Sequence, residues 1–363
     1  MTHNALNPAV HAGSVTGTGP LTLVRKLIDS ARRGEMDYEG RPPPKVDWTA
    51  YDLAQTRELA DMVAMIRELV DAAETRLRER RKRRPGRPAT PAADIAKVLL
   101  LQAYLEVPNR VAQGLVLLFG EKLGLSWEFS YKTIERGYDR RAVRRMLDEV
   151  FALTNEPVRG LERVLSVDGT GLPTSVKQNY ERDARSKEGR GALGYMRAVA
   201  VIGTSFKLFA GWRSTEDPAG SELALFPDAL REARAHQPGM AVVVGDGIYA
   251  GRPQCRLVGE LGAVPRFLPR RNATLKRFGV REWVDMLQAM ARDPQAWFAD
   301  FHLRSLSETG FSVLKNRKGP LRKRLSVRKE TEGFLDVVAH NIRRLNQLRY
   351  LAPYLPIPAF PAG

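Results

Sequence analysis

The segments Val164-Leu165-Ser166-Val167-Asp168-Gly169 and Ala241-Val242-Val243-Val244-Gly245-Asp246 share one pattern, an apolar run that ends in an acid. Apolar, β-branched runs bounded by turn residues predict buried strands. We expect Asp168 and Asp246 to stand at or just past the ends of neighbouring strands, where both carboxylates can face one crevice. Taken singly, each aspartate is better explained as a turn residue, because Asp-Gly is a hairpin signal and an aspartate after a strand commonly caps its own loop.

The patterns around these segments predict an α/β domain over residues 161–351. Strands are expected over 163–167, 195–202, 207–213, 240–244 and 264–269, and helices over 221–235, 252–261 and most of the chain after residue 280. Three strands in succession, followed by strands that alternate with helices, indicate a mixed sheet flanked by helices. Residues 352–363 are left as a C-terminal tail.

The chain before residue 161 has helical patterns. Residues 1–47 are expected to form a flexible arm around one short helix, 21–33, and a helical DNA-binding region is expected over 48–160. An amphipathic helix over 51–84 runs into a basic strap, 78–88, which contains Arg84 and Arg87 and is broken by proline and glycine. Such a strap can lie along phosphates or enter a minor groove, and a plain basic linker explains it equally well.

Residues 90–151 carry a helix-turn-helix-like pattern. Thr90 and Pro91 form a helix start, and helices are expected over 95–105, 108–122, 130–136 and 139–151. The third of these helices presents Lys132 and Arg136, which we expect to contact DNA. The alternative is an ordinary solvated basic face, because such patterns are common by chance and only the net charge supports this one.

The charge balance favours a polyanionic partner. Lys and Arg total 58 against 41 Asp and Glu, which gives a formal net charge of +17, so double-stranded DNA is the first candidate. An anionic membrane surface is a distant alternative, because no apolar run approaches the roughly 18 residues that a spanning helix needs. The chain has one cysteine, Cys255, and no signal-peptide pattern, so we expect a cytoplasmic, nucleoid-associated protein in which Cys255 is a core residue.

A third acid lies on the stretch 301–315, which is expected to form one helix. At 100° per residue, Phe301, Arg304, Glu308 and Lys315 fall on one face of that helix. An i, i+4 ion pair between Arg304 and Glu308 is the plain alternative. It does not explain why such a face follows two strand-end aspartates in a strongly basic protein. His302, beside this face, is expected to be a packing or surface residue.

These motifs together resemble the catalytic domain of bacterial insertion-sequence DDE transposases, which has an RNase H-like fold, and the resemblance covers residues 163–351. The stretch from Phe301 to Lys315 reproduces the family's Tyr-x2-Arg-x3-Glu-x6-Lys spacing. Phe301 replaces the motif tyrosine, so the phenol oxygen is lost, although its ring can still stack against a base. The other matching motifs are Val167-Asp168-Gly169-Thr170, Gly245-Asp246-Gly247-Ile248-Tyr249, Pro269-Arg270-Arg271-Asn272 and Asn341-Ile342-Arg343-Arg344-Leu345.

The resemblance implies a DNA transposase that cleaves the ends of its insertion sequence and joins the freed 3'-hydroxyl to target DNA. Asp168, Asp246 and Glu308 would hold two Mg²⁺ ions, which Mn²⁺ can replace, since hard oxygen ligands select these cations. Homodimerisation on DNA is implied, because two transposon ends must be held together. The residues expected to bind DNA are Arg304, Lys315, Phe301, Arg270, Arg271, Arg84, Arg87, Lys132 and Arg136.

Two alternatives to a transposase stay open. A nuclease or resolvase of the same fold would cut DNA without joining it, and a non-catalytic DNA-binding protein could derive from a transposase. Basic residues between the first two strands could guide DNA or belong to a solvated loop, and the two explanations weigh equally. These residues are Lys177, Arg182, Arg185, Lys187 and Arg190.

Overall fold

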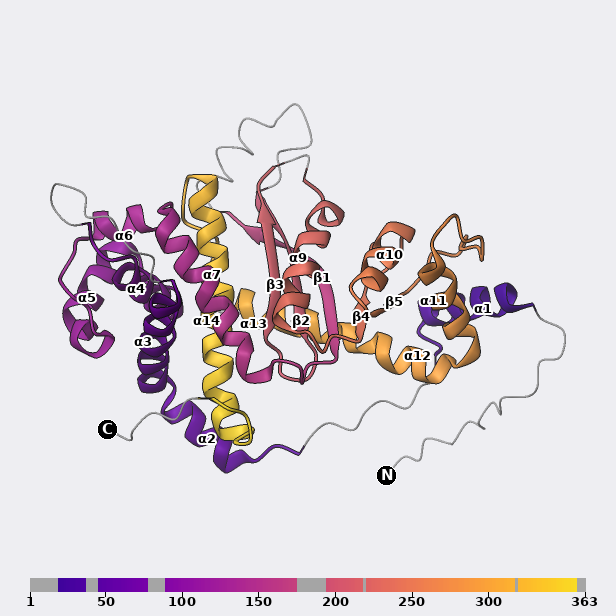
Figure 1. Ribbon diagram of the computed structural model, residues 1–363, viewed down its shortest axis with the longest axis horizontal. Helices are drawn as coiled ribbons and strands as arrows, with labels where there is room; N and C mark the ends of the chain where they lie inside the picture. Colours follow the sequence, from indigo (N-terminus) through magenta and orange to yellow (C-terminus); the bar gives the residue numbers. More distant parts are fainter. Residues whose placement is uncertain are drawn as a thin grey trace, which may run out of the picture.

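A five-stranded mixed sheet lies at the centre of the computed structural model, with a bundle of helices at one end and further helices at the other (Figure 1). The structure describes residues 19–36, 45–77, 89–174, 194–217, 220–316 and 319–357. For Glu308, Lys315 and Asn316 it describes the backbone alone.

The sheet has the strand order β3-β2-β1-β4-β5. The first three strands pair antiparallel as a meander, and β4 and β5 continue the sheet in parallel with β1. The expected mixed sheet flanked by helices is therefore confirmed, and its order is compatible with an RNase H-like core. The strands are β1 (Val164–Pro173), β2 (Tyr195–Gly203), β3 (Phe209–Thr215), β4 (Val242–Gly245) and β5 (Val264–Phe267).

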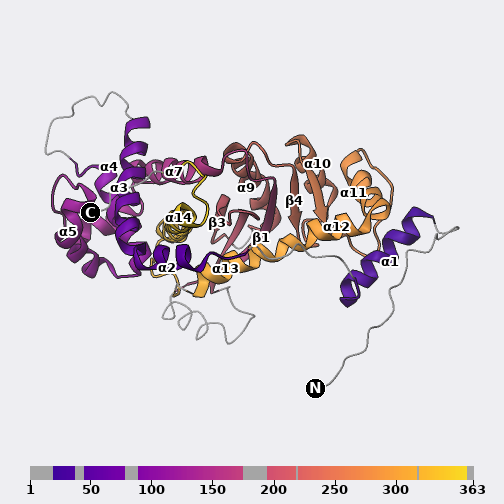
Figure 2. The same cartoon turned by 90° about the horizontal axis from the view of Figure 1, so that it is seen from below.

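Helices cover both faces of the sheet, because alternate strand residues are apolar on each side. On one face α9 (Glu222–His236) packs with Phe226 in the same cluster as Val167 and Val199. On the other face α13 (Ser305–Asn316) packs with Phe311 against Ala200. Figure 2 shows α9 and α13 on opposite sides of the strands.

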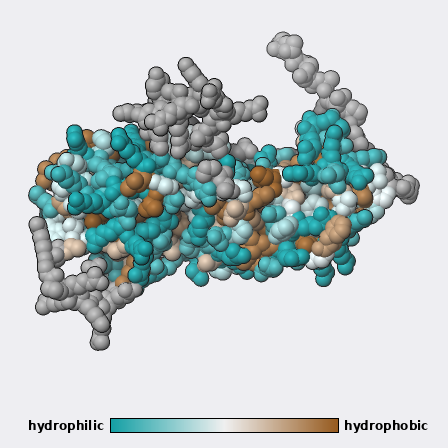
Figure 3. Space-filling model, turned by 90° about the horizontal axis from the view of Figure 1, so that it is seen from above, coloured by the Kyte–Doolittle hydropathy of each residue, from teal (hydrophilic) through white to brown (hydrophobic). Residues whose placement is uncertain are grey.

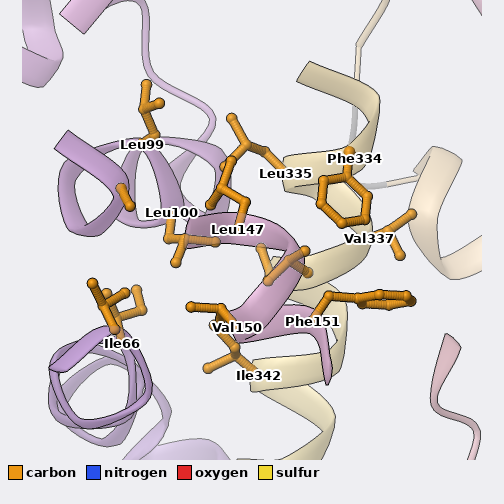
Figure 4. Packing of buried hydrophobic residues seen from close by; sticks show 14 of the residues in the cluster. Ile66, Leu99, Leu100, Leu147, Val150, Phe151, Phe334, Leu335, Val337 and Ile342 are labelled. Carbon is orange, nitrogen blue, oxygen red and sulfur yellow. The ribbon is translucent and has the colours of Figure 1, made fainter. Parts of the chain in front are cut away.

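The helical region before the sheet is joined to it through α14 (Ser326–Leu351). This helix packs against α2, α3, α4, α7 and also β3. Figure 4 shows Leu100, Phe151 and Phe334 in one shared core. The regions 48–160 and 161–351 therefore share a hydrophobic core. The helices before the sheet are α2 (Trp48–Thr56), α3 (Glu58–Arg76), α4 (Ala92–Leu105), α5 (Asn109–Leu123), α6 (Tyr131–Gly137), α7 (Arg141–Asn155) and the short η1 (Glu156–Val158).

The remaining helices lie beyond β5. They are α10 (Arg252–Glu260), α11 (Arg281–Arg292), α12 (Pro294–Phe301) and the 3-10 turn η2 (His302–Arg304). No helix in the part of the chain that the structure describes combines the length and apolar composition needed to cross a membrane.

Three expectations about the N-terminal half are wrong. Helix α1 (Pro20–Arg33) docks on α11, and its residues Val24 and Ile28 are fully buried, so this part of the predicted flexible arm is anchored. The helix predicted over 51–84 is two helices, α2 and α3, which are separated at Arg57. The N-cap of α4 is Pro91 and not Thr90. The strap 78–88 lies outside the described residues.

Candidate active site

Strand β1 is longer than its parallel pairing with β4. That pairing ends where Val167 lies opposite Gly245, whereas β1 continues to pair with β2 as far as Pro173. Asp168 was expected at or just past the end of its strand, but it lies inside β1. Asp246 directly follows β4, as expected. Val167 and Gly245 are the last paired residues of these two adjacent parallel strands, and each aspartate is the next residue along its chain segment. The two aspartates are therefore neighbours at this edge of the parallel part of the sheet.

Both aspartates also make the local hydrogen bonds of turn residues. Oδ1 of Asp168 accepts from the backbone N–H of Gly169 at 2.8 Å. Oδ1 of Asp246 accepts from the N–H of Ile248 at 2.8 Å. These bonds fix the direction of each carboxylate. Asp168 and Asp246 can therefore act as turn residues and still belong to one shared site.

Helix α13 is held directly against Asp168. The Ser166 hydroxyl donates to the carbonyl oxygen of Arg304 at 3.3 Å, and the Ser307 hydroxyl donates to the same oxygen at 2.7 Å. Oγ of Ser307 also lies 3.5 Å from Oδ2 of Asp168. The backbone of Glu308, the next residue, is thus brought beside β1.

The expected single helix over 301–315 is wrong, because its first turn is interrupted. Helix α12 ends at Phe301, a 3-10 turn spans His302–Arg304, and α13 begins at Ser305. The Phe301 ring is 5% exposed and stacks on Trp297 with ring centres 5.4 Å apart. The Phe301 ring was predicted to stack against a DNA base, but it packs in the core of the protein instead. The guanidinium of Arg304 lies 5.4 Å from the centre of the Phe301 ring.

Two residues expected to be packing residues are Cys255, which lies on α10, and the half-buried His302, which follows α12. The ring of His302 contacts the ring of Phe301 edge-on, with centres 5.7 Å apart. Cys255 is fully buried, and burial raises the pKa of its thiol to about 12. The pKa of His302 is lowered by burial and by the charge of Arg304, so its imidazole is neutral at pH 7.

A further acid, Glu222, reaches the same edge of the sheet from α9. A β-carbon at position 169 would collide with Cδ of Glu222, so the Glu222 carboxyl group occupies the space beside this glycine of β1. Burial raises the pKa of Glu222, the charge of Asp246 raises it further, and Arg197 opposes the shift. Sequence reasoning missed Glu222, because no motif or spacing connects the first turn of α9 with β1, which lies three elements earlier in the chain.

Tyr249, which follows β4, is buried in the hydrophobic cluster on the α9 side of the sheet. Its side chain is fully buried, and its hydroxyl has no hydrogen-bond partner among the described residues. Burial raises its pKa, and the charges of Glu222, Asp168 and Asp246 raise it further.

The site offers oxygen ligands of the kind that Mg²⁺ and Mn²⁺ prefer. Among the side chains that the structure describes, no three His, Cys, Asp or Glu residues come close enough together to bind a metal ion by themselves. The side chain of Glu308 lies outside that set. A complete three-carboxylate site with Asp168 and Asp246 therefore depends on Glu308.

The residues expected to bind DNA are placed in different surroundings. Lys132 and Arg136 are exposed on α6 and line an open pocket together with Arg110. Arg270 is exposed, whereas Arg271 forms an ion pair with Asp29 of α1 at 2.5 Å. The remaining basic residues of interest lie outside the described residues or side chains; they are Arg84, Arg87, Lys177, Arg182, Arg185, Lys187, Arg190 and Lys315.

Comparison with known proteins links this chain to a mobile element. It is 29% identical over 242 residues to a probable transposase for an insertion sequence element of Archaeoglobus fulgidus, and the match covers 66% of this chain and 71% of the relative. No known family profile matches the chain. The similarity supports a transposase in general and leaves the type of active site to be argued from the residues.

Proposed function

We propose that this protein is a DDE transposase with an RNase H-like core, in which Asp168, Asp246 and Glu308 form the catalytic triad. One observation carries the proposal. The parallel pairing of β1 with β4 ends at Val167 and Gly245, and Asp168 and Asp246 are the next residue of each segment. Ser307 of α13 lies 3.5 Å from Asp168, and Glu308 is the next residue of that helix, which supports the proposal. The similarity to an insertion-sequence transposase supports the same assignment.

The chemistry is the hydrolysis and transfer of phosphodiesters. Two divalent cations, Mg²⁺ or Mn²⁺, supply activation of the attacking oxygen and stabilisation of the leaving oxygen. The carboxylates of Asp168, Asp246 and Glu308 hold them, and the short bonds to Gly169 and Ile248 keep the two aspartates in fixed directions. Water would attack the phosphorus at the transposon end and break its bond to the 3'-oxygen, which leaves as a 3'-hydroxyl. That 3'-hydroxyl would then attack a phosphorus of target DNA in the same site and displace the target's own 3'-oxygen.

DNA is bound outside this edge of the sheet. A net charge of +17 supplies long-range attraction to the phosphates. The exposed side chains of Lys132, Arg136 and Arg270 contact the backbone of the duplex, and Arg304 and Lys315 bind phosphates near the transposon end. The face of the molecule in Figure 3 is mostly hydrophilic, with smaller apolar patches. Two protomers act together, each on one end of the element, in the bacterial cytoplasm.

The deciding experiment is cleavage and joining of a labelled duplex that carries the end of the protein's own element, with Mg²⁺. Asp168→Asn, Asp246→Asn and Glu308→Gln should bind the duplex but neither cut nor join it. Asp228→Asn is the matched control, because Asp228 is an exposed acid that pairs with Arg231 on α9. Wild-type cutting without joining would establish the nuclease alternative, and normal cutting by the three variants would refute the triad.

A further inference from the structure

Helix α5 keeps an apolar face in contact with solvent. Its residues Ala112, Leu115 and Val116 pack into the core of the helical region. On the opposite side Leu117 and Leu118 are 63% and 77% exposed. Single exposed leucines are ordinary on a protein surface, but a continuous apolar face indicates an interaction site. At 100° per residue this outer face of α5 is made of Arg110, Val111, Gly114, Leu117, Leu118 and Glu121.

Gly114 lies in the middle of the outer face of α5, and the fold itself does not need a glycine there. A β-carbon at this position would meet no packed neighbour within 4 Å among the described residues. Glycine destabilises a helix interior relative to alanine, so its presence needs another reason. The notch that it leaves beside Leu117 and Leu118 lets a side chain of a second helix approach α5 closely.

The two ends of the outer face carry opposite charges. Arg110 lies in the first turn of α5 and Glu121 in the last, about 16 Å away along the helix, and both side chains are exposed. The midpoint between Arg110 and Glu121 is also the midpoint between Gly114 and Leu117. Two α5 helices that pack antiparallel about this midpoint therefore place Arg110 opposite Glu121 of the partner subunit, and Leu117 opposite Gly114 of the partner subunit.

We propose that the outer face of α5 binds the same face of a second copy of this chain, in an antiparallel pair with twofold symmetry. The choice of partner follows from charge complementarity. One helix supplies both members of the ion pair, so the outer face is complementary to itself, as a twofold interface requires. The inference also rests on the proposed function, which needs two protomers, each on one end of the element.

Duplex DNA is the competing occupant of this face. The guanidinium of Arg110 lies 5.6 Å from the centre of the Tyr131 ring on α6, and Arg110 lines the same open pocket as Lys132 and Arg136. Glu121, however, would repel phosphates, and the exposed leucines offer them no hydrogen bond. The basic side chains of α6 therefore lie beside the interface, so that two paired protomers hold two duplexes next to one another.

The contact is small, and this determines when it forms. One helix face buries less than the about 800 Å² per partner that stable complexes bury, so the pair is weak in free solution. Figures 1 and 2 show α5 at the outer end of the helical region, where a second copy can reach it. Two protomers on one DNA molecule have an effective concentration of about the millimolar range, at which a weak contact forms.

The test is sedimentation of the full-length protein, free at rising concentration and on duplex DNA long enough for two protomers. Arg110→Glu and Glu121→Arg each place like charges at both ends of the pair, and each should weaken self-association about tenfold or more. The double variant has the net charge of the wild type and should restore association. Leu117→Glu should also weaken it, whereas the control Leu59→Glu, at a 45% exposed position on α3, should not.

The outcomes separate this inference from the proposed function. A protein that stays monomeric under both conditions, or a double reversal that fails to restore association, overturns the inference alone if the wild type still cuts and joins DNA. A dimer that is insensitive to Leu117→Glu and to both reversals uses another interface and overturns it too. If Arg110→Glu weakens DNA binding but not association, the face binds DNA. If the dimer behaves as expected but DNA is neither cut nor joined, the proposed function fails and the interface stands.

Discussion

Gly310 sets how closely α13 approaches the sheet. A β-carbon at this position would lie 2.9 Å from Cδ1 of Ile202 on β2, which is too close for a contact between carbon atoms. Glycine at position 310 therefore lets the helix that carries Glu308 lie against β2 without displacing the Ile202 side chain. This explains why a glycine, a poor helix former, occurs inside α13.

Gly310→Ala should push α13 outward and lower DNA cleavage about tenfold, because small displacements of a catalytic group are costly. Ile202→Val removes the atom that the new β-carbon would meet, so the double variant should recover cleavage. The comparison of the three variants in a cleavage assay checks this. If Ile202→Val fails to rescue Gly310→Ala, the contact between α13 and β2 does not position Glu308.

The aspartates of the site could be predicted from the sequence, whereas Glu222 could not. Asp168 and Asp246 each end an apolar run, and strand direction alone makes them neighbours. Glu222 and Tyr249 reach the site through packing between elements that are distant in the chain, and this leaves no local signal. The Phe301 ring was misplaced for a related reason, because its burial is decided by contact with Trp297.

At the scale of elements, a charged network ties α6 to the start of α14 and to the segment before it. Glu135 accepts from Nζ of Lys323 at 2.7 Å and from the guanidinium of Arg328 at 2.6 Å, and Arg328 also pairs with Asp139. Lys323 is only 9% exposed, so its charge depends on Glu135 for compensation. Burial alone would raise the pKa of Glu135, but the two cations outweigh it and lower the pKa below the usual 4.5.

Glu135→Gln should destabilise the fold by about 1–3 kcal/mol at pH 7, because it leaves Lys323 without its partner. The pKa of Glu135 is lowered on folding, so its contribution is present above pH 4.5 and is lost as the pH falls through the lower, folded value. Urea unfolding at several pH values should show the difference between wild type and variant shrinking below pH 4.5.

The exposed Asp148, which pairs with Arg144 on α7, gives the matched control. Asp148→Asn should change stability by less than about 0.5 kcal/mol at any of these pH values. A wild-type to Glu135→Gln difference that stays constant down to pH 3 would contradict the assignment of this network.

Element boundaries were predicted well where one amphipathic period runs through a helix, and poorly where two segments meet. Helix α1 was recognised, but its docking on α11 depends on Val24 and Ile28 finding a distant partner. Strand β1 continues past Asp168 because β2 pairs with it, and β2 begins only at Tyr195, far along the chain from Asp168. The break of the 301–315 helix at His302–Arg304 also has no glycine or proline to announce it.

At the scale of the whole molecule, the helical region and the sheet share one core through α14. The exposed basic side chains of α6 therefore have a fixed position relative to Asp168 in β1 and Asp246 after β4. A rigid arrangement of this kind lets one duplex contact both places, which a flexible linker between two domains would not ensure.

Lys132→Ala combined with Arg136→Ala should weaken binding to duplex DNA and make its affinity less dependent on salt. Each lost phosphate contact lowers the slope of log affinity against log salt by about 0.9, so the pair should lower it by about 2. Arg231→Ala combined with Arg281→Ala removes the same charge from two exposed, ion-paired positions. An equal change of slope in both double variants would show that α6 makes no specific phosphate contact.

The central claim, that β1, β4 and α13 build one metal site, can be tested without knowledge of the DNA substrate. Fe²⁺ bound in place of Mg²⁺, with ascorbate and peroxide, cleaves the polypeptide next to the ion, and the fragments can be mapped by mass spectrometry. The account predicts cuts near Asp168, Asp246 and Glu308 that excess Mg²⁺ suppresses and Asp168→Asn abolishes. Cuts confined to other segments, or cuts unaffected by Asp168→Asn, would contradict it.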